Sequence, residues 1–272
     1  MSTFRLQQFS IEQNLSGMKV CSDSLLFGAM IPVKGVERIL DIGTGTGILA
    51  LMQAQKAYSA TERSIIKITA IELTEEAARE ATKNFNASPW RASIEMIQQD
   101  IQSFAKQHTA RRSTQKVIAE SVKENCVYPY DLIICNPPFF EEHSRTHSDN
   151  GLRNIARHTD RLSYSELCEA MSSLLASNGN AYVLIPTASL TVFSKAVLNE
   201  GLEIDQITHI SESIKHPAKV SVLHLKHIKS NRKKISVASR VERTLYKFDS
   251  NKVHTEEVKG YLEGFLLRYS LE

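Results

Sequence analysis

The sequence predicts an α/β fold in which helices cover both faces of a doubly wound, mainly parallel sheet. Three observations indicate it. Apolar stretches alternate with segments of helical periodicity, a glycine-rich turn joins the first stretch to a helix, and 272 residues, 42% of them hydrophobic, suffice for one sizeable core. Seven strands are expected, the last two as a hairpin, at 38–43, 65–73, 93–101, 130–136, 180–186, 204–211 and 219–228.

Helices are expected between these strands. Thr74 can cap the first turn of one helix, and Gly179 can end another. The expected helices span 46–57, 74–88, 163–179, 189–201 and, in the tail, 255–269. Residues 102–129 are polar and helix-prone, which indicates a surface insertion. We therefore predict an N-terminal segment at 1–37, a main domain at 38–228 containing that insertion, and a small C-terminal extension at 229–272.

Composition excludes some classes of protein. No stretch approaches the roughly 20 apolar residues of a membrane span, and the N-terminus lacks the apolar run of a signal peptide. The cysteines are scattered without CxxC spacing, which predicts free thiols in a reducing cytoplasm. The net charge of +3 is compatible with an RNA partner but does not establish one. The four cysteines are Cys21, Cys126, Cys135 and Cys168.

The glycine-rich turn, LDIGTGTG at 40–47, follows the first strand. Ile48 stands where the dinucleotide fingerprint needs its third glycine, and the turn has no lysine for a P-loop. Glycines let the chain turn tightly and bring backbone close to a ligand. Asp41 at the strand tip disfavours a pyrophosphate but suits a cationic amino-acid portion, and S-adenosylmethionine is such a ligand. The predicted cofactor-binding glycines are Gly43, Gly45 and Gly47.

Acidic residues end the next two strands as well. Glu72, followed by Leu73, is placed to accept both hydroxyls of a ribose, and Asp100 is placed to accept from an adenine amine that Ile101 covers. A single acid at a strand end is more often a helix cap or a solvated residue. Three successive strand-end acids with a glycine turn predict a cofactor site, because ligands of open α/β sheets bind at the carboxyl ends of the strands.

The fourth strand runs into an unusual end, DLIICNPPFF at 131–140. The amines of adenine, guanine and glutamine are poor nucleophiles, because the nitrogen lone pair is delocalised. Asn136 and the carbonyl of Pro137, stiffened by Pro138, supply two acceptors for such an NH2 group. Phe139 can stack on a planar base, a contact of about 1–3 kcal/mol. We predict a catalytic clamp, with an ordinary strand-ending turn as the alternative.

These residues resemble class I S-adenosylmethionine-dependent methyltransferases that act on amino groups and, more narrowly, the bacterial tRNA1(Val) (adenine(37)-N6)-methyltransferase family. The resemblance implies a Rossmann-like sheet of seven strands with the last antiparallel. It also implies methylation of the N6 amine of adenosine 37 in the anticodon loop of tRNA1(Val), with S-adenosylmethionine as cofactor. The segments that carry the resemblance are 18–33, 39–55, 70–73, 86–90, 131–140 and 162–175.

In that family the segment before the first strand covers the cofactor. The resemblance therefore implies that Lys19, Ser22 and Asp23 border the methionine end of S-adenosylmethionine. The sequence departs from the family pattern at Cys21 and Ser22, where a glycine–threonine pair is usual. Ser22 keeps the hydroxyl, so cofactor binding is expected to survive.

Basic residues are candidates for holding the RNA backbone, although a solvated surface charge is the alternative for each of them. They are Arg111, Arg112, Lys229, Arg232, Lys233 and Lys234. The polar loop at 141–160 is expected to be a substrate lid. His143, His147 and His158 lie in this loop without a carboxylate or cysteine to complete a metal set, so no metal is expected.

The sequence is also compatible with other functions. The amine could be guanine N2 of ribosomal RNA or the glutamine of a peptide-release factor, although about 37 residues before the first strand are too few for the helical substrate domain of the glutamine enzymes. A non-catalytic RNA-binding protein on the same fold is the alternative of another class.

Overall fold

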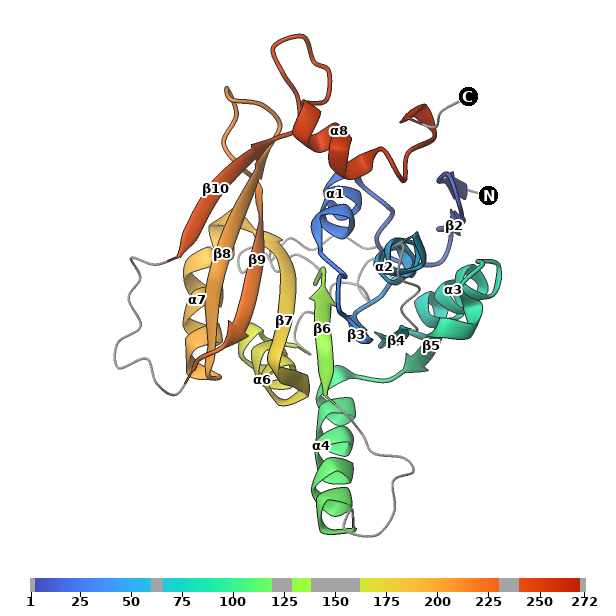
Figure 1. Ribbon diagram of the computed structural model, residues 1–272, viewed down its shortest axis with the longest axis vertical. Helices are drawn as coiled ribbons and strands as arrows, with labels where there is room; N and C mark the ends of the chain where they lie inside the picture. The colour runs from blue at the N-terminus through green and yellow to red at the C-terminus, as the bar shows by residue number, and fades with distance from the viewer. Residues whose placement is uncertain (1–2, 60–65, 119–128, 138–161, 230–239, 270–272) are drawn as a thin grey trace, which may run out of the picture.

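The computed structural model describes residues 3–59, 66–118, 129–137, 162–229 and 240–269. A central sheet of eight strands carries helices on both faces, which confirms the predicted α/β class (Figure 1). The strand order is β10-β8-β9-β7-β6-β3-β4-β5. The strands are β3 (Arg38–Ile42), β4 (Lys67–Glu72), β5 (Ile94–Gln98), β6 (Tyr130–Cys135), β7 (Leu175–Pro186), β8 (Leu202–Ser211), β9 (Val220–His227) and β10 (Val241–Tyr246).

The sheet is mostly parallel. Strands β5, β4, β3, β6 and β7 run parallel, and β9 is antiparallel to both β7 and β8. The seven predicted strands are all present, and the last of them is the antiparallel one. The eighth, β10, comes from the predicted C-terminal extension and pairs in parallel with β8. Of its side chains only that of Leu245 is buried, so 241–246 has little of the apolar pattern of a core strand.

Helices bury the two faces of the sheet in two separate cores. One core joins α1, α2, α3 and α8 to the sheet, and the other joins α4, α6 and α7 to the opposite face. The two faces of β6 show why: Leu132 and Ile134 point into the first core, and Ile133 and Cys135 into the second. The helices are α1 (Ser22–Met30), α2 (Ile48–Ser59), α3 (Glu75–Asn86), α4 (Ile101–Ile118), α6 (Tyr164–Leu174), α7 (Leu190–Asn199) and α8 (Glu256–Leu262).

Three local predictions need correction. The helix expected at 163–179 ends at Leu174, and Gly179 lies inside β7, where the pairing with β6 shifts register. Thr74 occupies the N-cap of α3, but its hydroxyl donates to Glu72 instead of capping the helix. The third strand ends at Gln98, and Ile101 begins a helix.

Part of the predicted insertion is the crossover helix of the fold. Helix α4 connects β5 to β6, and its first turns are anchored in the core by Ile101, Phe104 and Ala105. Its second half extends beyond the end of the sheet (Figure 1). Residues 119–128 lie outside the described part of the chain.

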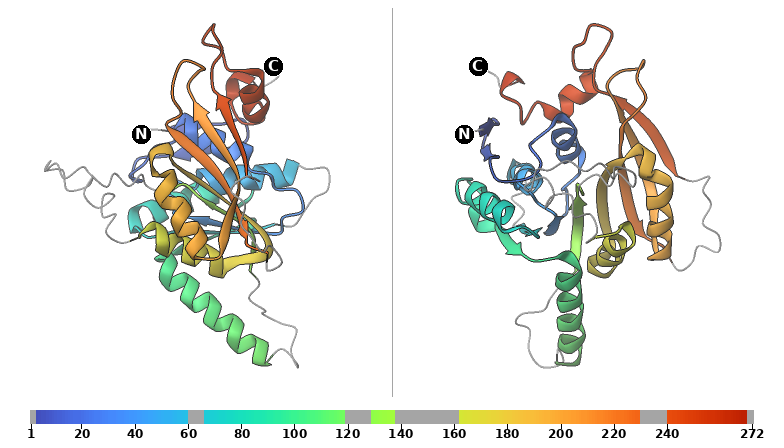
Figure 2. Two further views of the ribbon diagram at one scale, coloured as in Figure 1. Left: turned by 90° about the vertical axis from the view of Figure 1, so that its left-hand side faces the viewer. Right: turned by 180° about the vertical axis from the view of Figure 1, so that it is seen from behind.

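The two chain ends meet on the same side of the molecule (Figures 1 and 2). A small hairpin, β1 (Thr3–Arg5) and β2 (Ser10–Glu12), precedes α1. Gln7 donates its backbone N–H to the carbonyl of Phe265 at 2.9 Å, and Gln55 of α2 donates to the carbonyl of Gly264 at 2.6 Å. The N-terminal hairpin and the segment after α8 therefore lie together beside the first core. Within the described ranges, no helix is long and apolar enough to cross a membrane.

Candidate active site

The glycine turn after β3 has a backbone that only glycine adopts readily. Gly43, Gly45 and Gly47 have φ values of +68°, +54° and +85°. At Gly47 a Cβ would also lie 2.4 Å from Cε1 of Phe85, so helix α3 approaches the turn too closely for any side chain. The turn is closed by a hydrogen bond of 2.8 Å from Gly47 N–H to the carbonyl of Thr44. Within the turn Gly43 is exposed and Gly45 half-buried, so peptide backbone reaches the surface at these two positions at the carboxyl end of β3.

Asp41 lies fully buried beneath this turn. Its Oδ2 accepts from the hydroxyl of Thr44 at 2.6 Å and from the N–H of Ala50 at 3.2 Å. Its Oδ1 is buried and no described residue donates a hydrogen bond to it. Burial raises the pKa of Asp41 to about 7, against the two hydrogen bonds, which lower it. A nearby cationic group would stabilise the charged form of this buried carboxylate.

Glu72, at the end of β4, fastens the glycine turn to the start of α3. Its Oε2 accepts from Gly45 N–H at 3.1 Å, and its Oε1 accepts from the N–H groups of Leu73 and Thr74, both at 3.0 Å. Each carboxylate oxygen has about two acceptor sites, and the hydrogen bond from the glycine turn occupies one of those on Oε2. Leu73 is exposed, so its side chain offers apolar surface beside this acceptor.

Asp100 behaves as a helix cap. Its Oδ1 accepts from Ser103 N–H at 2.7 Å at the start of α4. A helix cap is the alternative role that the sequence analysis gave for an acid at a strand end. Ile101, which we expected to cover a ring, is the first residue of α4 and is buried in the second core. Asp100 nonetheless stands at the same edge of the sheet as Asp41 and Glu72, because β3, β4 and β5 are parallel neighbours.

Asn136 follows β6 at the same edge. Cys135 of β6 pairs with Ile42 of β3, so Asn136 leaves the sheet next to the start of the glycine turn. The side-chain oxygen of Asn136 is buried and has no hydrogen-bond partner among the residues that the structure describes. Such an atom costs about 1–3 kcal/mol unless a ligand satisfies it. Pro137 is buried, and Pro138 and Phe139 lie outside the described residues.

The N-terminal segment is strapped to α3 beside the glycine turn by two polar residues that the sequence reasoning missed. The carboxylate of buried Glu80 accepts from the N–H groups of Leu15 at 2.9 Å and Ser16 at 2.8 Å. Asn84 donates to the carbonyls of Glu12 at 2.9 Å and Thr46 at 2.8 Å. Glu80 and Asn84 are four residues apart and so lie on one face of α3, and this spacing is the sequence feature from which their shared role could have been predicted.

Glu80 also shows how this strap is held electrostatically. Burial alone raises the pKa of this carboxyl, but the backbone N–H groups of residues 14–16 outweigh it and hold the pKa below its ordinary value. The charged form is therefore the one that binds the strap.

Ser22 and Asp23 begin α1, where Cys21 caps the helix and forms a capping box with Ser24. The ammonium of Lys247 lies 3.0 Å from Oδ1 of Asp23 and 3.4 Å from the hydroxyl of Ser22. Lys19 is exposed.

Lys247 follows β10, is 6% exposed, and pairs with Glu212 as well as Asp23. Burial lowers its pKa, but the hydrogen bonds to Glu212 and Asp23 outweigh burial and raise the pKa above its ordinary value. Nothing local in the sequence indicates this contact, because it joins the two ends of the chain.

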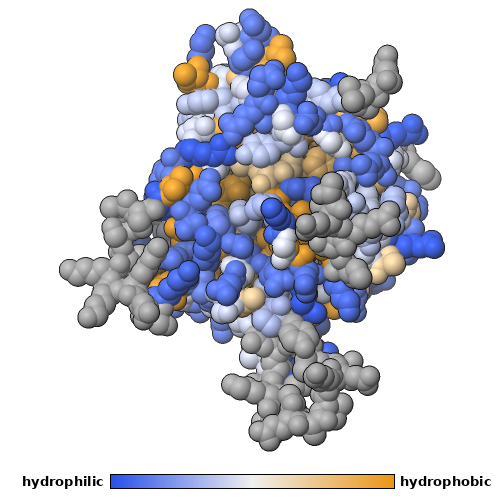
Figure 3. Space-filling model, in the orientation of Figure 1, coloured by the Kyte–Doolittle hydropathy of each residue, from blue (hydrophilic) through white to orange (hydrophobic). Residues whose placement is uncertain are grey.

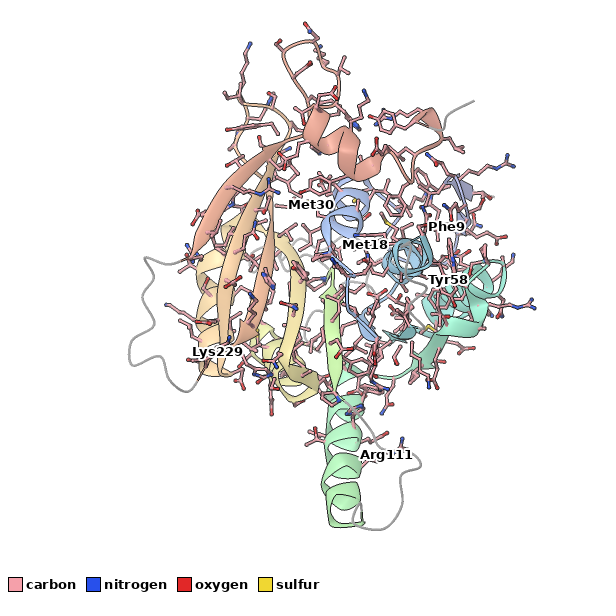
Figure 4. The ribbon with its side chains drawn as sticks, viewed as in Figure 1. Phe9, Met18, Met30, Tyr58, Arg111 and Lys229 are labelled. Carbon is pink, nitrogen blue, oxygen red and sulfur yellow. The ribbon has the colours of Figure 1, made fainter. Side chains whose placement is uncertain are left out.

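The predicted RNA-binding residues that the structure describes lie away from this edge. Lys229 follows β9, which ends where β7 begins: Nε2 of His227 is 3.3 Å from the carbonyl of Leu175. Arg111 is exposed on the second half of α4 (Figure 4). Both positions are at the amino ends of the parallel strands, opposite Asn136. Nothing is described of the Arg112 side chain or of Arg232, Lys233 and Lys234.

The surface between α1 and the strands β7 and β9 is hollowed, with apolar groups inside and a hydrophilic rim, above the tip of β6 (Figures 1 and 3). In the part of the chain that the structure describes, no three His, Cys, Asp or Glu residues gather as a metal site. The predicted lid at 141–160, with its histidines, lies outside that part.

Comparison with known proteins identifies relatives of the whole chain. A family model described as O-methyltransferase matches residues 3–134. A tRNA1(Val) (adenine(37)-N6)-methyltransferase of Shewanella sediminis is 36% identical over 98% of this chain and 99% of its own length. One of Pseudoalteromonas translucida is 31% identical over 98% of this chain and 100% of its own length.

Solved structures share the fold at low sequence identity. A predicted O-methyltransferase of Agrobacterium tumefaciens has a TM-score of 0.55 at 18% identity, covering 89% of this chain and 95% of its own. A putative class I S-adenosylmethionine-dependent methyltransferase of Listeria monocytogenes has a TM-score of 0.52 at 14% identity, covering 82% of this chain and 62% of its own. These two likenesses establish the class I fold alone.

Proposed function

Because this chain belongs to the tRNA1(Val) (adenine(37)-N6)-methyltransferase family, we propose that it transfers a methyl group from S-adenosylmethionine to the N6 amine of adenosine 37 in the anticodon loop of tRNA1(Val). The observation that carries the proposal is the buried side-chain oxygen of Asn136 at the tip of β6, next to the glycine turn, which has no hydrogen-bond partner within the described part of the chain. An amine donor would satisfy that oxygen.

The residues at the strand ends fit S-adenosylmethionine. Asp41 keeps a buried oxygen without a partner, which suits the cationic amino group of the cofactor, and the turn at 43–47 lets its backbone approach closely. Glu72 would accept the ribose hydroxyls beside Leu73, and Asp100 the adenine amine. Bound there, S-adenosylmethionine supplies an electrophilic methyl group on a sulfonium.

The clamp would act on the nucleophile. Asn136 and the carbonyl of Pro137 accept from the two N6 hydrogens, which favours a pyramidal nitrogen with its lone pair directed outward. Both acceptors sit on a strand end stiffened by proline, so the gain comes from positioning and preorganised electrostatics. The amine becomes cationic on methylation and loses its proton readily, so no strong general base is required. Phe139 would stack on the adenine ring.

The N-terminal segment would close the cofactor site. Lys19, Ser22 and Asp23 would border the methionine end, with Asp23 oriented by Lys247. We place the protein in the cytoplasm with its tRNA. The alternatives, guanine N2 of ribosomal RNA or the glutamine of a release factor, are less favoured, because full-length relatives carry the adenine-37 name. A non-catalytic RNA binder would have no use for an orphaned amide at the strand tip.

The test is nucleoside mass spectrometry of total tRNA from cells with and without the gene. N6-methyladenosine should disappear from tRNA1(Val) in the deletion strain and return with the wild-type gene but not with Asn136→Ala. With purified protein, labelled S-adenosylmethionine should label a tRNA1(Val) transcript, and a transcript with guanosine at position 37 is the matched control. Equal labelling of both transcripts would refute the assignment of adenosine 37, and no labelling would favour the pure binder.

A further inference from the structure

Two hairpin loops project together from the carboxyl edge of the sheet. One, residues 212–219, joins β8 to β9, and the other, residues 247–255, joins β10 to α8. They lie side by side at the end of the molecule opposite the far end of α4 in each of the views of Figures 1 and 2. We refer to these two segments as the loop pair.

The loop pair is a single, internally braced unit. Lys247 N–H donates to the carbonyl of Ser211 at 2.8 Å, and Phe248 N–H donates to the carbonyl of Glu212 at 2.9 Å. The ammonium of Lys247 adds an ion pair with the Glu212 carboxylate. Asp249 braces the second loop by accepting from the N–H of Val253 at 3.1 Å. A surface ordered in advance loses little conformational entropy on binding.

The loop pair carries more positive than negative charge, four lysines against the carboxylates of Glu212 and Asp249. Lys215, Lys219 and Lys252 are exposed, and none of them pairs with a carboxylate among residues 3–59, 66–118, 129–137, 162–229 and 240–269. The acids of the loops are already engaged, Glu212 by Lys247 and Asp249 by backbone N–H groups. The cations are therefore free to meet an external anion.

The same unit exposes apolar groups near those cations. Ile214 is 79% exposed and Val253 is 60% exposed. The space-filling view shows apolar tips on otherwise hydrophilic loops at this end (Figure 3). Lysines next to apolar side chains suit a sugar–phosphate backbone, because lysine binds phosphate as a point charge and the apolar groups can cover the sugar.

The position of the loop pair relates it to the candidate active site. Val220, at the end of the first loop, pairs with Pro186 at the carboxyl end of β7, and β7 is the neighbour of β6. Thr187 N–H, just after β7, donates to the carbonyl of Lys219 at 2.9 Å. Two strand spacings, about 10 Å, therefore separate β9 from β6 at the edge where Asn136 stands.

We propose that the loop pair binds the phosphate backbone of the RNA stem whose loop carries the target adenosine. The inference rests on the proposed function and replaces Arg111 and Lys229, which lie at the opposite edge, as the main RNA contact among the described residues. Lys215, Lys219 and Lys252 contact successive phosphates, and Ile214 packs on a neighbouring ribose. The stem is thereby held while its loop reaches the clamp.

The test compares two sets of charge reversals in the full chain. The first combines Lys215→Glu, Lys219→Glu and Lys252→Glu. The control combines Arg111→Glu with Lys229→Glu and is compared with the double variant Lys215→Glu with Lys252→Glu, which changes the net charge equally. Affinity for the anticodon stem-loop is measured over a salt series, together with kcat, KM and S-adenosylmethionine affinity. The triple variant should bind RNA at least about tenfold more weakly, with a log–log salt slope reduced by about 2–3, because three phosphate contacts are lost. Its cofactor affinity and kcat at saturating RNA should stay unchanged.

Two outcomes would overturn the proposal: the triple variant keeps its RNA affinity and salt slope, or the control loses them instead. Lys→Gln versions of the three substitutions provide a second, milder series, with cofactor affinity reporting a folded protein. The proposed function is tested separately, by measuring methyl transfer with the wild-type protein. If the unmodified protein binds RNA but transfers no methyl group to it, the enzyme assignment is wrong and the loop-pair measurement can still be read.

Discussion

Replacing Asn136 by alanine should separate stability from activity. The side-chain oxygen of Asn136 is buried and has no partner among the described residues, so we expect its removal to relieve an unsatisfied polar group. Asn84 is the matched control, because it is buried and its amide is fully used: Oδ1 accepts from Glu12 N–H at 2.9 Å, and Nδ2 donates to Glu12 and Thr46. The same substitution should therefore have opposite effects at the two positions.

The magnitudes follow from those contacts. Asn84→Ala loses three hydrogen bonds at about 1 kcal/mol each and should lower the free energy of unfolding by roughly 3 kcal/mol. Asn136→Ala should leave the free energy of unfolding unchanged or raise it by about 1 kcal/mol, since an orphaned buried oxygen costs about 1–3 kcal/mol. Loss of an acceptor aimed at the reacting amine should lower kcat by a factor of about 100–1,000.

Urea titration gives the free energy of unfolding of both variants, and single-turnover methyl transfer to tRNA gives the rate. Cofactor affinity, measured by calorimetry, should change little in Asn136→Ala. If Asn136→Ala is destabilised as much as Asn84→Ala, the amide is a structural group in the free protein. If it keeps the wild-type rate, the clamp is misplaced. Either result refutes the reasoning.

Gly47→Ala should lower the free energy of unfolding by about 2–5 kcal/mol, because φ is +85° and the new Cβ would lie 2.4 Å from Cε1 of Phe85. Gly43→Ala, whose new Cβ would have no atom within 4 Å, should lower it by only about 1–2 kcal/mol in the same urea titration. Asp41→Asn should remove a pH dependence. The wild-type free energy of unfolding falls as pH rises from 3.8 to about 7, because the unfolded chain releases this proton first, and a variant curve of equal slope would contradict the assignment. Lys247→Met should weaken cofactor binding by leaving two carboxylates unpaired; unchanged calorimetric affinity would separate Lys247 from the cofactor site.

Features encoded by neighbouring residues could be predicted from the sequence. The glycine turn requires positive φ at three glycines, and strand ends follow from where apolar runs stop. Because parallel strands finish at one edge, Asp41, Glu72, Asp100 and Asn136 were correctly expected to share it. These are short-range rules, so they need no knowledge of distant contacts.

Features set by contacts between distant residues were decided only by the tertiary structure. The pattern of 241–246 is too polar to mark β10 as a sheet strand, and the pairing of Lys247 with Asp23 joins residues more than two hundred positions apart. The sequence shows that Arg111 and Lys229 are charged but not which edge they occupy. Charge is a property of a residue, whereas its distance from the active site depends on how the strands are ordered, and that order is settled by packing.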